Sequence, residues 1–257
     1  MAFLEYIDGL QAILERIKRE QAHNIKQAGL FVAKALSAGG IIHTFGTGHS
    51  HLIADEAFFR AGGIAAVNPI LHERIIFLRG ALESTRTEQE YGFARQLLAQ
   101  ENVSDIDAAI IISNSGRNAA PIEMALEMKA LGLKVIAITN LEQSRAARPR
   151  HSSGKRLYEV VDVVVDNCVP PGDAVLELPS LETRIGPSST VAGAAIINSI
   201  IIEAVAELLR QDEPVPVLPS ANSDGVSEQT LSEMLRRYQA RIKYIDVDEP
   251  VAEKRRG

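Results

Sequence analysis

The chain has 257 residues, of which 46% are hydrophobic and 23% charged, and 27 lysine and arginine residues against 33 aspartate and glutamate residues give it a formal net charge of −6. This composition is typical of a globular protein and excludes a disordered chain, a collagen and a disulfide scaffold, and the lack of a basic stripe argues against a nucleic-acid partner. Cys168 is the single cysteine, so an intramolecular disulfide and a cysteine-built zinc site are excluded, and we expect a reducing, cytoplasmic location.

Residues 1–38 are predicted to form a helical segment. Its first helix should be amphipathic, because apolar residues recur at spacings of three and four positions, at Phe3, Ile7, Leu10, Leu14 and Ile17. A second helix is expected over 24–37, and the pair of glycines at 39–40 should end it.

Residues 39–211 alternate short apolar strands with helices. We expect strands over 41–45, 107–113, 134–139 and 160–165, and helices over 51–61, 86–100, 119–131 and 187–210. This alternation predicts an α/β fold whose parallel sheet is covered by helices on both faces. The basic stretch 142–156 is predicted to be a long loop or a mobile flap. Polar residues interrupt the apolar run of the last helix, so we expect no membrane span.

Residues 212–257 are expected to form a proline-rich linker, a C-terminal helix and a tail. Three prolines break the chain after the apolar helix, and an amphipathic helix is predicted over 226–241. The basic run at 253–256 is interpreted as a solvated chain end.

Two loops follow predicted strands, at the edge of the sheet where open α/β folds bind ligands. The first is Gly46-Thr47-Gly48-His49-Ser50, whose glycines let the backbone approach a ligand. The second places hydroxyl groups, amides and a guanidinium group at the start of a helix, as Ser113-Asn114-Ser115-Gly116-Arg117-Asn118. Either loop alone could be a plain strand-to-helix turn, but together they favour an anion, most simply a phosphate group.

Two other phosphate-binding patterns fit the chain poorly. The first loop begins like a dinucleotide-binding G-x-G-x-x-G motif, but His51 occupies the position of the third glycine. The P-loop pattern G-x-x-x-x-G-K-[ST] does not occur in the sequence.

The residues of both loops resemble those of the sugar isomerase (SIS) domain family. The strand at 135–139 resembles the third strand of that domain, and the stretch 144–173 resembles a bacterial branch similar to phosphoheptose isomerases. The resemblance covers most of residues 1–210. It implies a flavodoxin-like three-layer sandwich in which a five-stranded parallel sheet binds a phosphorylated sugar, and it implies a homodimer or homotetramer. The residues that it implies for the phosphate are Ser113, Asn114, Ser115 and Asn118, with Ser50 facing the ligand.

The chain departs from this family at the positions of known acid and base residues. The glutamate that phosphoheptose isomerases carry ten residues after the serine of the first loop falls on Arg60, and their late glutamine and histidine fall near Thr190 and Asn198. The glutamate of the lyases that open N-acetylmuramic acid phosphate ethers falls on Phe58. The resemblance therefore implies a phosphosugar site without assigning its reaction.

Carboxylates and histidines near the first loop are candidates for proton transfer in a sugar isomerase. We predict catalytic roles for Asp55 and Glu56, one turn into the following helix, and for His72, in a loop at the sheet edge. Glu56 could instead pair with Arg60, four residues further on. His49 with His51 could form half of a divalent-metal site, but we assign no metal and no other cofactor.

Three further residues are predicted to contact the substrate. His151, beside two basic residues, could close over an anionic sugar or could belong to a solvated loop. Ser188 and Ser189 open the late helix, where they could bind the sugar or cap the helix.

The sequence thus predicts an enzyme that binds a small anionic sugar, most simply a sugar phosphate, and isomerises it between aldose and ketose forms. A phosphosugar-binding sensor without catalysis and a sugar-phosphate lyase remain open, and a sulfonated sugar would satisfy the same loops. No helix-turn-helix is evident that would make a sensor a transcription regulator.

Overall fold

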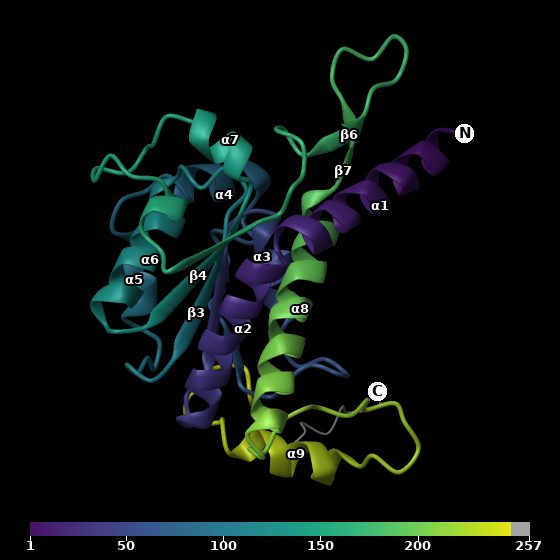
Figure 1. Ribbon diagram of the computed structural model, residues 1–257. Helices are drawn as coiled ribbons and strands as arrows, with labels where there is room; N and C mark the ends of the chain where they lie inside the picture. The colour runs from purple at the N-terminus through teal and green to yellow at the C-terminus, as the bar shows by residue number, and fades with distance from the viewer. Residues whose placement is uncertain (248–257) are drawn as a thin grey trace, which may run out of the picture.

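The structure is a computed structural model that describes residues 1–247; the basic run at 253–256 lies outside the described residues. Figure 1 shows its elements in chain order. They are α1 (Ala2–Glu20), α2 (Ala22–Ser37), β1 (Ile42–Gly46), α3 (Ser50–Glu56), β2 (Val67–Pro69), α4 (Ala81–Thr87), α5 (Phe93–Leu98), β3 (Ala108–Ile112), α6 (Ala119–Ala130), β4 (Lys134–Thr139), α7 (Leu141–Ala146), the 3₁₀ turn η1 (Leu157–Glu159), β5 (Val163–Asp166), β6 (Ala174–Leu176), β7 (Ile185–Pro187), α8 (Ser189–Arg210) and α9 (Glu228–Arg236).

Five parallel strands form the central sheet, in the order β2-β1-β3-β4-β5. This is the flavodoxin-like order, in which the direction of strand addition reverses between β1 and β3. The register pairs Ile42 with Ala108 and Ala108 with Lys134, so these three strands start and end nearly level. The predicted α/β fold with a five-stranded parallel sheet is confirmed, and the loops after β1 and β3 leave the same edge of the sheet.

Helices cover both faces of the sheet, which makes three layers. On one face α1, α2, α3 and α8 pack against alternate strand residues such as Ile110 and Ile112. On the other face α5 and α6 pack against the intervening residues, such as Ile111. Because strand side chains alternate between faces, each central strand supplies both cores and reads as one continuous apolar run.

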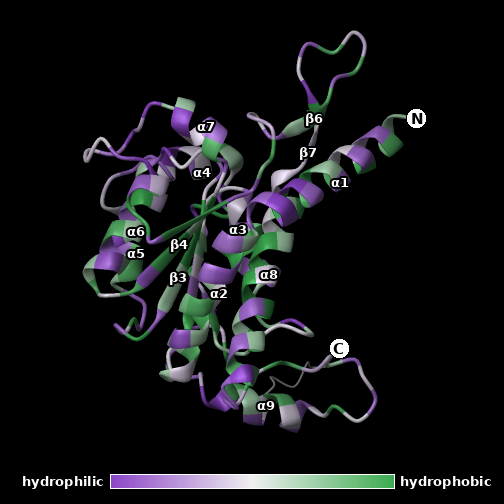
Figure 2. Ribbon diagram, in the orientation of Figure 1, coloured by the Kyte–Doolittle hydropathy of each residue, from purple (hydrophilic) through white to green (hydrophobic). Residues whose placement is uncertain are grey.

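The helix α8 is long and apolar enough, by length and composition, to cross a membrane. In the structure one side of α8 packs against α2, and the approach is close: a Cβ on Gly29 would lie 2.6 Å from the Cβ of Glu203. The other side leaves Ile202 64% exposed and Leu209 58% exposed. Figure 2 shows that hydrophobic residues occur along the whole length of α8.

Several predicted boundaries were wrong. The single helix expected over 86–100 is two helices, because the chain breaks at Gly92, whose φ of 79° is left-handed. The helix expected over 51–61 ends at Glu56. The loop expected over 142–156 contains most of α7, and the antiparallel β6–β7 hairpin lies in a stretch for which no strand was predicted.

A buried polar cluster ties the C-terminal segment to the sheet. The carboxylate of Asp107 accepts hydrogen bonds from the side chain of Arg241 (2.5 Å) and from the backbone N–H groups of Ile41 and Ser104, and it lies 3.1 Å from Nε2 of His43. Burial alone would raise the pKa of Asp107, but these contacts outweigh it and lower the pKa to about 2. Asp107 is therefore ionised and paired, and it holds the segment after α9 against the sheet.

We expect the substitution Asp107→Asn to lower the free energy of unfolding at pH 7 by about 2 kcal/mol, since each pKa unit is worth about 1.4 kcal/mol. The folded-state pKa lies below the unfolded value, so this stabilisation is present above about pH 4 and disappears as the pH falls toward 2. Urea unfolding of both proteins across this range measures the difference. Asp105→Asn, at an exposed neighbouring carboxylate, is the control and should change stability little. Equal stability of the wild type and Asp107→Asn at pH 7 would contradict the assignment.

Candidate functional site

The loop after β1 turns sharply into α3, and it needs glycine to do so. A Cβ on Gly46 would lie 2.4 Å from the carbonyl oxygen of Ser50, and Gly48 has a left-handed φ of 54°. The N–H of Gly48 donates to the carbonyl of Ile75 (2.9 Å), so the segment after β2 braces the loop. The loop is therefore a close-packed turn, in which Thr47 is buried and His49 is exposed to solvent.

The loop after β3 is built in a similar way. Gly116 has φ 56°, and a Cβ there would lie 2.7 Å from Oγ of Ser144. The hydroxyl of Ser113 accepts from the N–H of Gly116 (3.2 Å), and Oδ1 of Asn114 accepts from the amide of Asn167 (2.7 Å). These contacts fix the backbone of the loop where it enters α6.

Asn118 stands at the N-cap of α6, but its side chain makes no cap hydrogen bond there. Its Nδ2 donates to Oε1 of Glu88 (2.7 Å), and its Oδ1 accepts from Nη1 of Arg150 (3.0 Å). The first N–H groups of α6 are thus left without a capping side chain from Asn118, at the end of a helix that attracts anions.

Glu88, directly after α4, joins the two loops. Its Oε2 accepts from the hydroxyl of Thr47 (2.8 Å), and its Oε1 accepts from Asn118. Its backbone carbonyl accepts from the N–H of Ala120 (3.0 Å), in the first turn of α6. Burial raises the pKa of the Glu88 carboxyl group above its usual range, and the Thr47 hydrogen bond and the charge of Arg150 offset only part of that rise. A carboxyl group with a raised pKa at the ligand edge of the sheet is suited to proton transfer.

A basic segment, residues 148–156, lies over the loop after β3 and is called the flap below. The N–H of Arg150 donates to the carbonyl of Arg117 (2.8 Å), and the hydroxyl of Tyr91 donates to the carbonyl of Arg150. His151 packs its ring against Tyr91, with centroids 5.8 Å apart, and its Nδ1 bonds the hydroxyl of Ser153. The Nε of Arg117 is buried without a hydrogen-bond partner.

The structure brings together most residues predicted to bind substrate. The two loops, 46–50 and 113–118, meet through Glu88, and His151 lies on the flap that contacts the second loop. Ser188 and Ser189 are engaged elsewhere: their hydroxyl groups donate to Asp173, at 2.7 and 2.8 Å.

The predicted catalytic residues make other contacts. Glu56 forms an ion pair with Arg60 and accepts a hydrogen bond from Asn198 (3.2 Å). Asp55 is exposed on α3. His72 accepts from the N–H of Arg74 (3.2 Å) and packs edge-on against Phe93. These contacts neither support nor contradict a catalytic role, so the roles of Asp55, Glu56 and His72 stay predictions.

Sequence reasoning missed Glu88 and the contact between Arg150 and Asn118. The expected helix over 86–100 placed Glu88 on a helix surface, whereas the break at Gly92 leaves it at a helix end. The Tyr91-Gly92 pair was the one signal that could have revealed that break.

Within residues 1–247, no group of three or more His, Cys, Asp and Glu side chains is arranged to hold a metal ion. The rings of His49 and His51 both pack against Phe77, with centroids 4.9 and 5.8 Å away, and Nδ1 of His51 bonds the carbonyl of Gly48. These contacts are those of packed rings rather than of a convergent pair of ligands.

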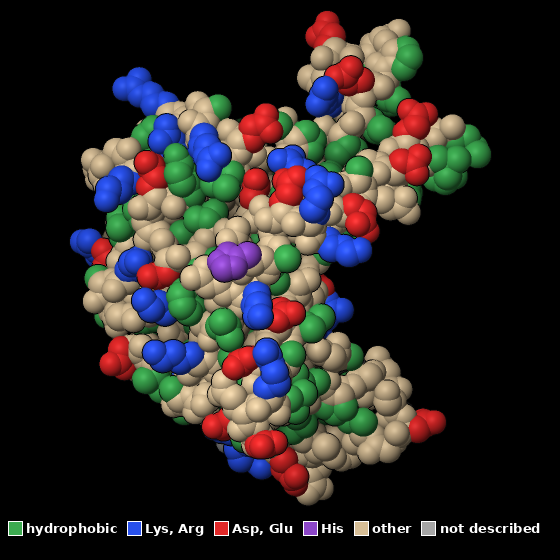
Figure 3. Space-filling view, in the orientation of Figure 1, with side chains coloured by type: hydrophobic (Ala, Val, Ile, Leu, Met, Phe, Trp, Pro, Cys, Tyr) green, Lys and Arg blue, Asp and Glu red, His purple; other side chains and the backbone are tan. Residues whose placement is uncertain are grey.

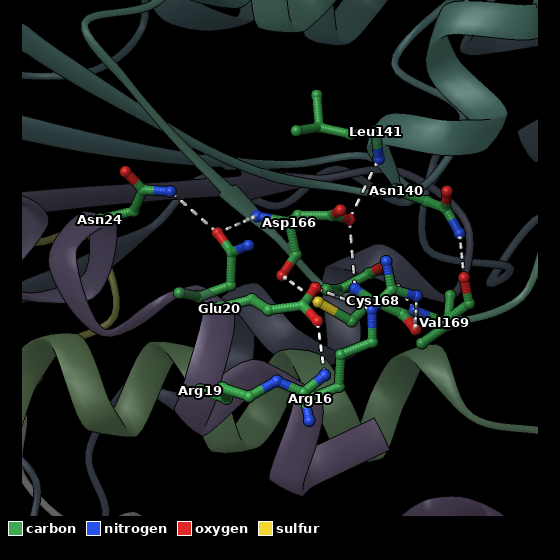
Figure 4. Close-up of polar contacts among 11 residues, drawn as sticks. Arg16, Arg19, Glu20, Asn24, Asn140, Leu141, Asp166, Cys168 and Val169 are labelled. Atoms are coloured by element: carbon green, nitrogen blue, oxygen red, sulfur yellow. Dashed lines mark hydrogen bonds and ion pairs between the residues drawn. The ribbon is translucent and has the colours of Figure 1, made fainter. Parts of the chain in front are cut away.

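Figure 4 shows a second polar network, between α1 and the loop after β5. Oδ1 of Asp166 accepts from the N–H groups of Leu141 and Cys168 (both 3.1 Å), and Arg16 reaches the carbonyl of Cys168. Burial raises the pKa of the Cys168 thiol to about 11, so it stays protonated near neutral pH and is a poor nucleophile. This network anchors the first helix beside β5 and the loop that follows it.

Comparisons with known proteins agree with this architecture. The chain matches the SIS domain over residues 5–140. It is 38% identical to a UPF0309 protein of Listeria innocua over 243 residues, which are 95% of this chain and 98% of the relative. It is 40% identical to a UPF0309 protein of Thermoanaerobacter pseudethanolicus over 246 residues, which cover 94% of this chain and 99% of that relative.

Among solved structures, a phosphoheptose isomerase of Francisella tularensis superposes with a TM-score of 0.50 at 18% identity, covering 80% of this chain and 97% of that one. A phosphoheptose isomerase of Neisseria gonorrhoeae gives a TM-score of 0.50 at 16% identity, covering 80% and 95%. At these identities the likeness concerns the fold. The family match and the relatives that align over nearly their whole length place the chain in the SIS domain family, among the UPF0309 proteins.

Proposed function

We propose that the chain binds a phosphosugar between the loops after β1 and β3 and isomerises it, with Glu88 as the proton-transferring group. The observation that carries this proposal is the bridging carboxyl group of Glu88, which contacts both loops and has a raised pKa. The SIS fold supports the ligand class, since the two solved relatives above are phosphoheptose isomerases.

The phosphate group binds at the start of α6. That helix has 12 residues, and its dipole and the hydroxyl groups of Ser113 and Ser115 favour an anion. In its first turn Ala120 already donates its N–H to the carbonyl of Glu88, and Pro121 has no N–H to donate. Arg117, in the loop, and Arg150, on the flap, add positive charge. The sugar then extends toward Thr47 and Ser50, past Glu88.

The carboxylate of Glu88 removes the proton from the hydroxyl-bearing carbon next to the sugar carbonyl, which leaves an enediolate. Glu88 returns that proton to the former carbonyl carbon, and the hydroxyl proton moves from one sugar oxygen to the other, so that an aldose and a ketose interconvert without loss of atoms or electrons. The raised pKa serves both steps, because a base whose pKa lies closer to neutral pH both takes and gives up the proton readily. Glu56, Asp55 and His72 are the alternative carriers of this proton.

The substitution Ser115→Ala should weaken phosphosugar binding about tenfold or more, because a hydrogen bond to a charged group is worth about 1.5–3 kcal/mol. A thermal-shift screen of sugar phosphates, their free sugars and sulfonated sugars measures this. A ligand at about 100 times its dissociation constant should raise the wild-type melting temperature by about 5–10 °C, and Ser115→Ala should show about half of that shift or less.

The control for this experiment is Ser223→Ala, an exposed serine in the linker before α9, which should match the wild type. A shift with a sugar phosphate but not with its free sugar supports the anion site. If Ser115→Ala binds the ligand as tightly as the wild type, Ser115 only forms the turn and does not bind the phosphate group. If no sugar phosphate raises the melting temperature, the phosphosugar assignment is wrong.

The substitution Glu88→Gln should lower turnover of the ligand found in that screen by about a hundredfold or more while binding is retained, because the amide cannot accept the proton. Glu56→Gln is the matched variant and should keep its turnover. If Glu56 is the base, Glu56→Gln loses turnover instead and Glu88→Gln keeps it. Proton exchange with solvent at the sugar carbon, followed by NMR, reports the step directly.

The other outcomes of this experiment identify the alternatives. Ligand binding without exchange or product in the wild type identifies a sensor. Release of a group from the sugar, in place of a rearranged sugar, identifies a lyase.

We further propose that a second copy of the chain covers α8. Figures 1 and 3 show the molecule hollowed along α8, with α1 and the β6–β7 hairpin projecting at one end and the region of α9 at the other. Both α1 and α8 carry exposed apolar side chains toward solvent, among them Phe3, Ile7, Ile202 and Leu209. Exposed apolar side chains on two helices that pack together favour an interface between subunits.

Light scattering should therefore give a dimer or tetramer for the wild type. Ile202→Glu should weaken association by about 100-fold, since burying an unpaired charge costs on the order of 3 kcal/mol or more. Leu131→Glu, at an exposed leucine after α6, should leave the mass unchanged. A monomeric wild type would refute this proposal.

A further inference from the structure

Arg150, Asn118 and Glu88 form a continuous chain of hydrogen bonds from the flap into the site. Nη1 of Arg150 donates to Oδ1 of Asn118 at 3.0 Å, and Nδ2 of the same amide donates to Oε1 of Glu88 at 2.7 Å. Arg150 is exposed, whereas Asn118 is only 6% exposed. An exposed cation on the flap is thus connected to a half-buried carboxyl group by a single buried amide.

The direction of the amide matters, because an asparagine side chain can present either its oxygen or its nitrogen to a neighbour. A guanidinium group can only donate, so Arg150 keeps Oδ1 of Asn118 turned toward the flap. The NH₂ group must then face Glu88, where it stabilises the ionised carboxylate. A reversed amide would set two oxygens against each other and would favour the protonated carboxyl group.

We propose that Arg150 is a positioning residue that fixes the orientation of Asn118 and thereby keeps Glu88 ionised. Its positive charge acts in the same direction, against the effect of burial on the carboxyl group. Glu88 as the base of an isomerase rests on the function proposed above; its coupling to Arg150 does not.

The groups that face Glu88 come from three elements. Thr47 donates from the loop after β1, Asn118 donates from the loop after β3, and Arg150 acts from the flap. The nearby carboxylate of Glu90 is paired with Arg74 at 2.7 Å. Tyr91 and His151 contact each other beside Arg150.

The flap backbone is held independently of the Arg150 side chain, which makes the proposal testable. The N–H of Arg150 donates to the carbonyl of Arg117, and its carbonyl accepts from Tyr91. Both are main-chain contacts that a substitution at position 150 retains. Arg150→Gln therefore removes the charge and leaves the flap in place.

The test is the titration of Glu88 in the full chain without sugar, followed by carboxyl ¹³C NMR, with Glu88→Gln identifying the signal. Arg150→Gln should raise the titration midpoint of Glu88 by about one pH unit. This is the lower end of the shift that a neighbouring arginine causes, because Arg150 is exposed and solvent screens its charge. Arg150→Lys, which keeps the charge, should restore part of the difference.

Arg148→Gln is the matched control, because Arg148 is another exposed arginine of the flap and should leave the midpoint unchanged. The effect of Arg150→Gln should also shrink in an Asn118→Ala background, since the amide is then missing. An unchanged midpoint in Arg150→Gln would overturn the proposal, as would equal shifts in Arg150→Gln and Arg148→Gln or an undiminished effect without Asn118.

These outcomes are separate from those of the proposed function. A protein that binds no sugar phosphate but shows the Arg150-dependent titration retains the coupling and loses the phosphosugar function. A protein that binds and isomerises a sugar phosphate with an Arg150-independent midpoint retains the function and loses the coupling.

Discussion

The contact of the Glu88 carboxyl group with Thr47 and Asn118 is the interaction on which the site depends. The two loops belong to strands that are adjacent in the sheet but separated by some sixty residues of chain. The parallel pairing of β1 with β3 brings their carboxyl ends together at one edge of the sheet. Glu88 then connects them, so that the β1 loop, the β3 loop and the start of α6 form one unit.

A buried carboxyl group, Asp107, and a half-buried one, Glu88, show how the partners of a carboxylate decide its role. Asp107 accepts from Arg241 and from two backbone N–H groups, so its pKa falls to about 2 and it serves as a fixed anion that holds the C-terminal segment. Burial raises the pKa of Glu88, and its two neutral hydrogen-bond donors and one exposed cation offset only part of that rise. The first arrangement stabilises the fold, and the second suits a group that exchanges a proton.

The flap gives this site a basic border that the sheet alone lacks. It contacts the loop after β3 through main-chain hydrogen bonds at Arg150 and through the side-chain contact with Asn118. The charge of the flap can thus influence a buried group while the flap itself stays exposed to solvent.

The sequence by itself determined the layers and the two loops, because both follow from local rules. Continuous apolar runs between helical patterns require a parallel sheet covered on both faces, and Gly46, Gly48 and Gly116 occupy turns that a side chain would block. Serine and asparagine at the start of a helix indicated an anion site without any knowledge of the sheet order.

Only the tertiary structure decided which titratable groups meet at those loops. Glu88 is distant in sequence from both Thr47 and Asn118, and no periodicity relates them. The break at Gly92 leaves Glu88 at the end of α4 instead of inside a single helix. Glu56 was the more plausible residue from spacing alone, yet Arg60, beyond the end of α3, pairs with it. Spacing along a chain predicts local neighbours well, whereas contacts across a sheet arise only once the strands have been ordered.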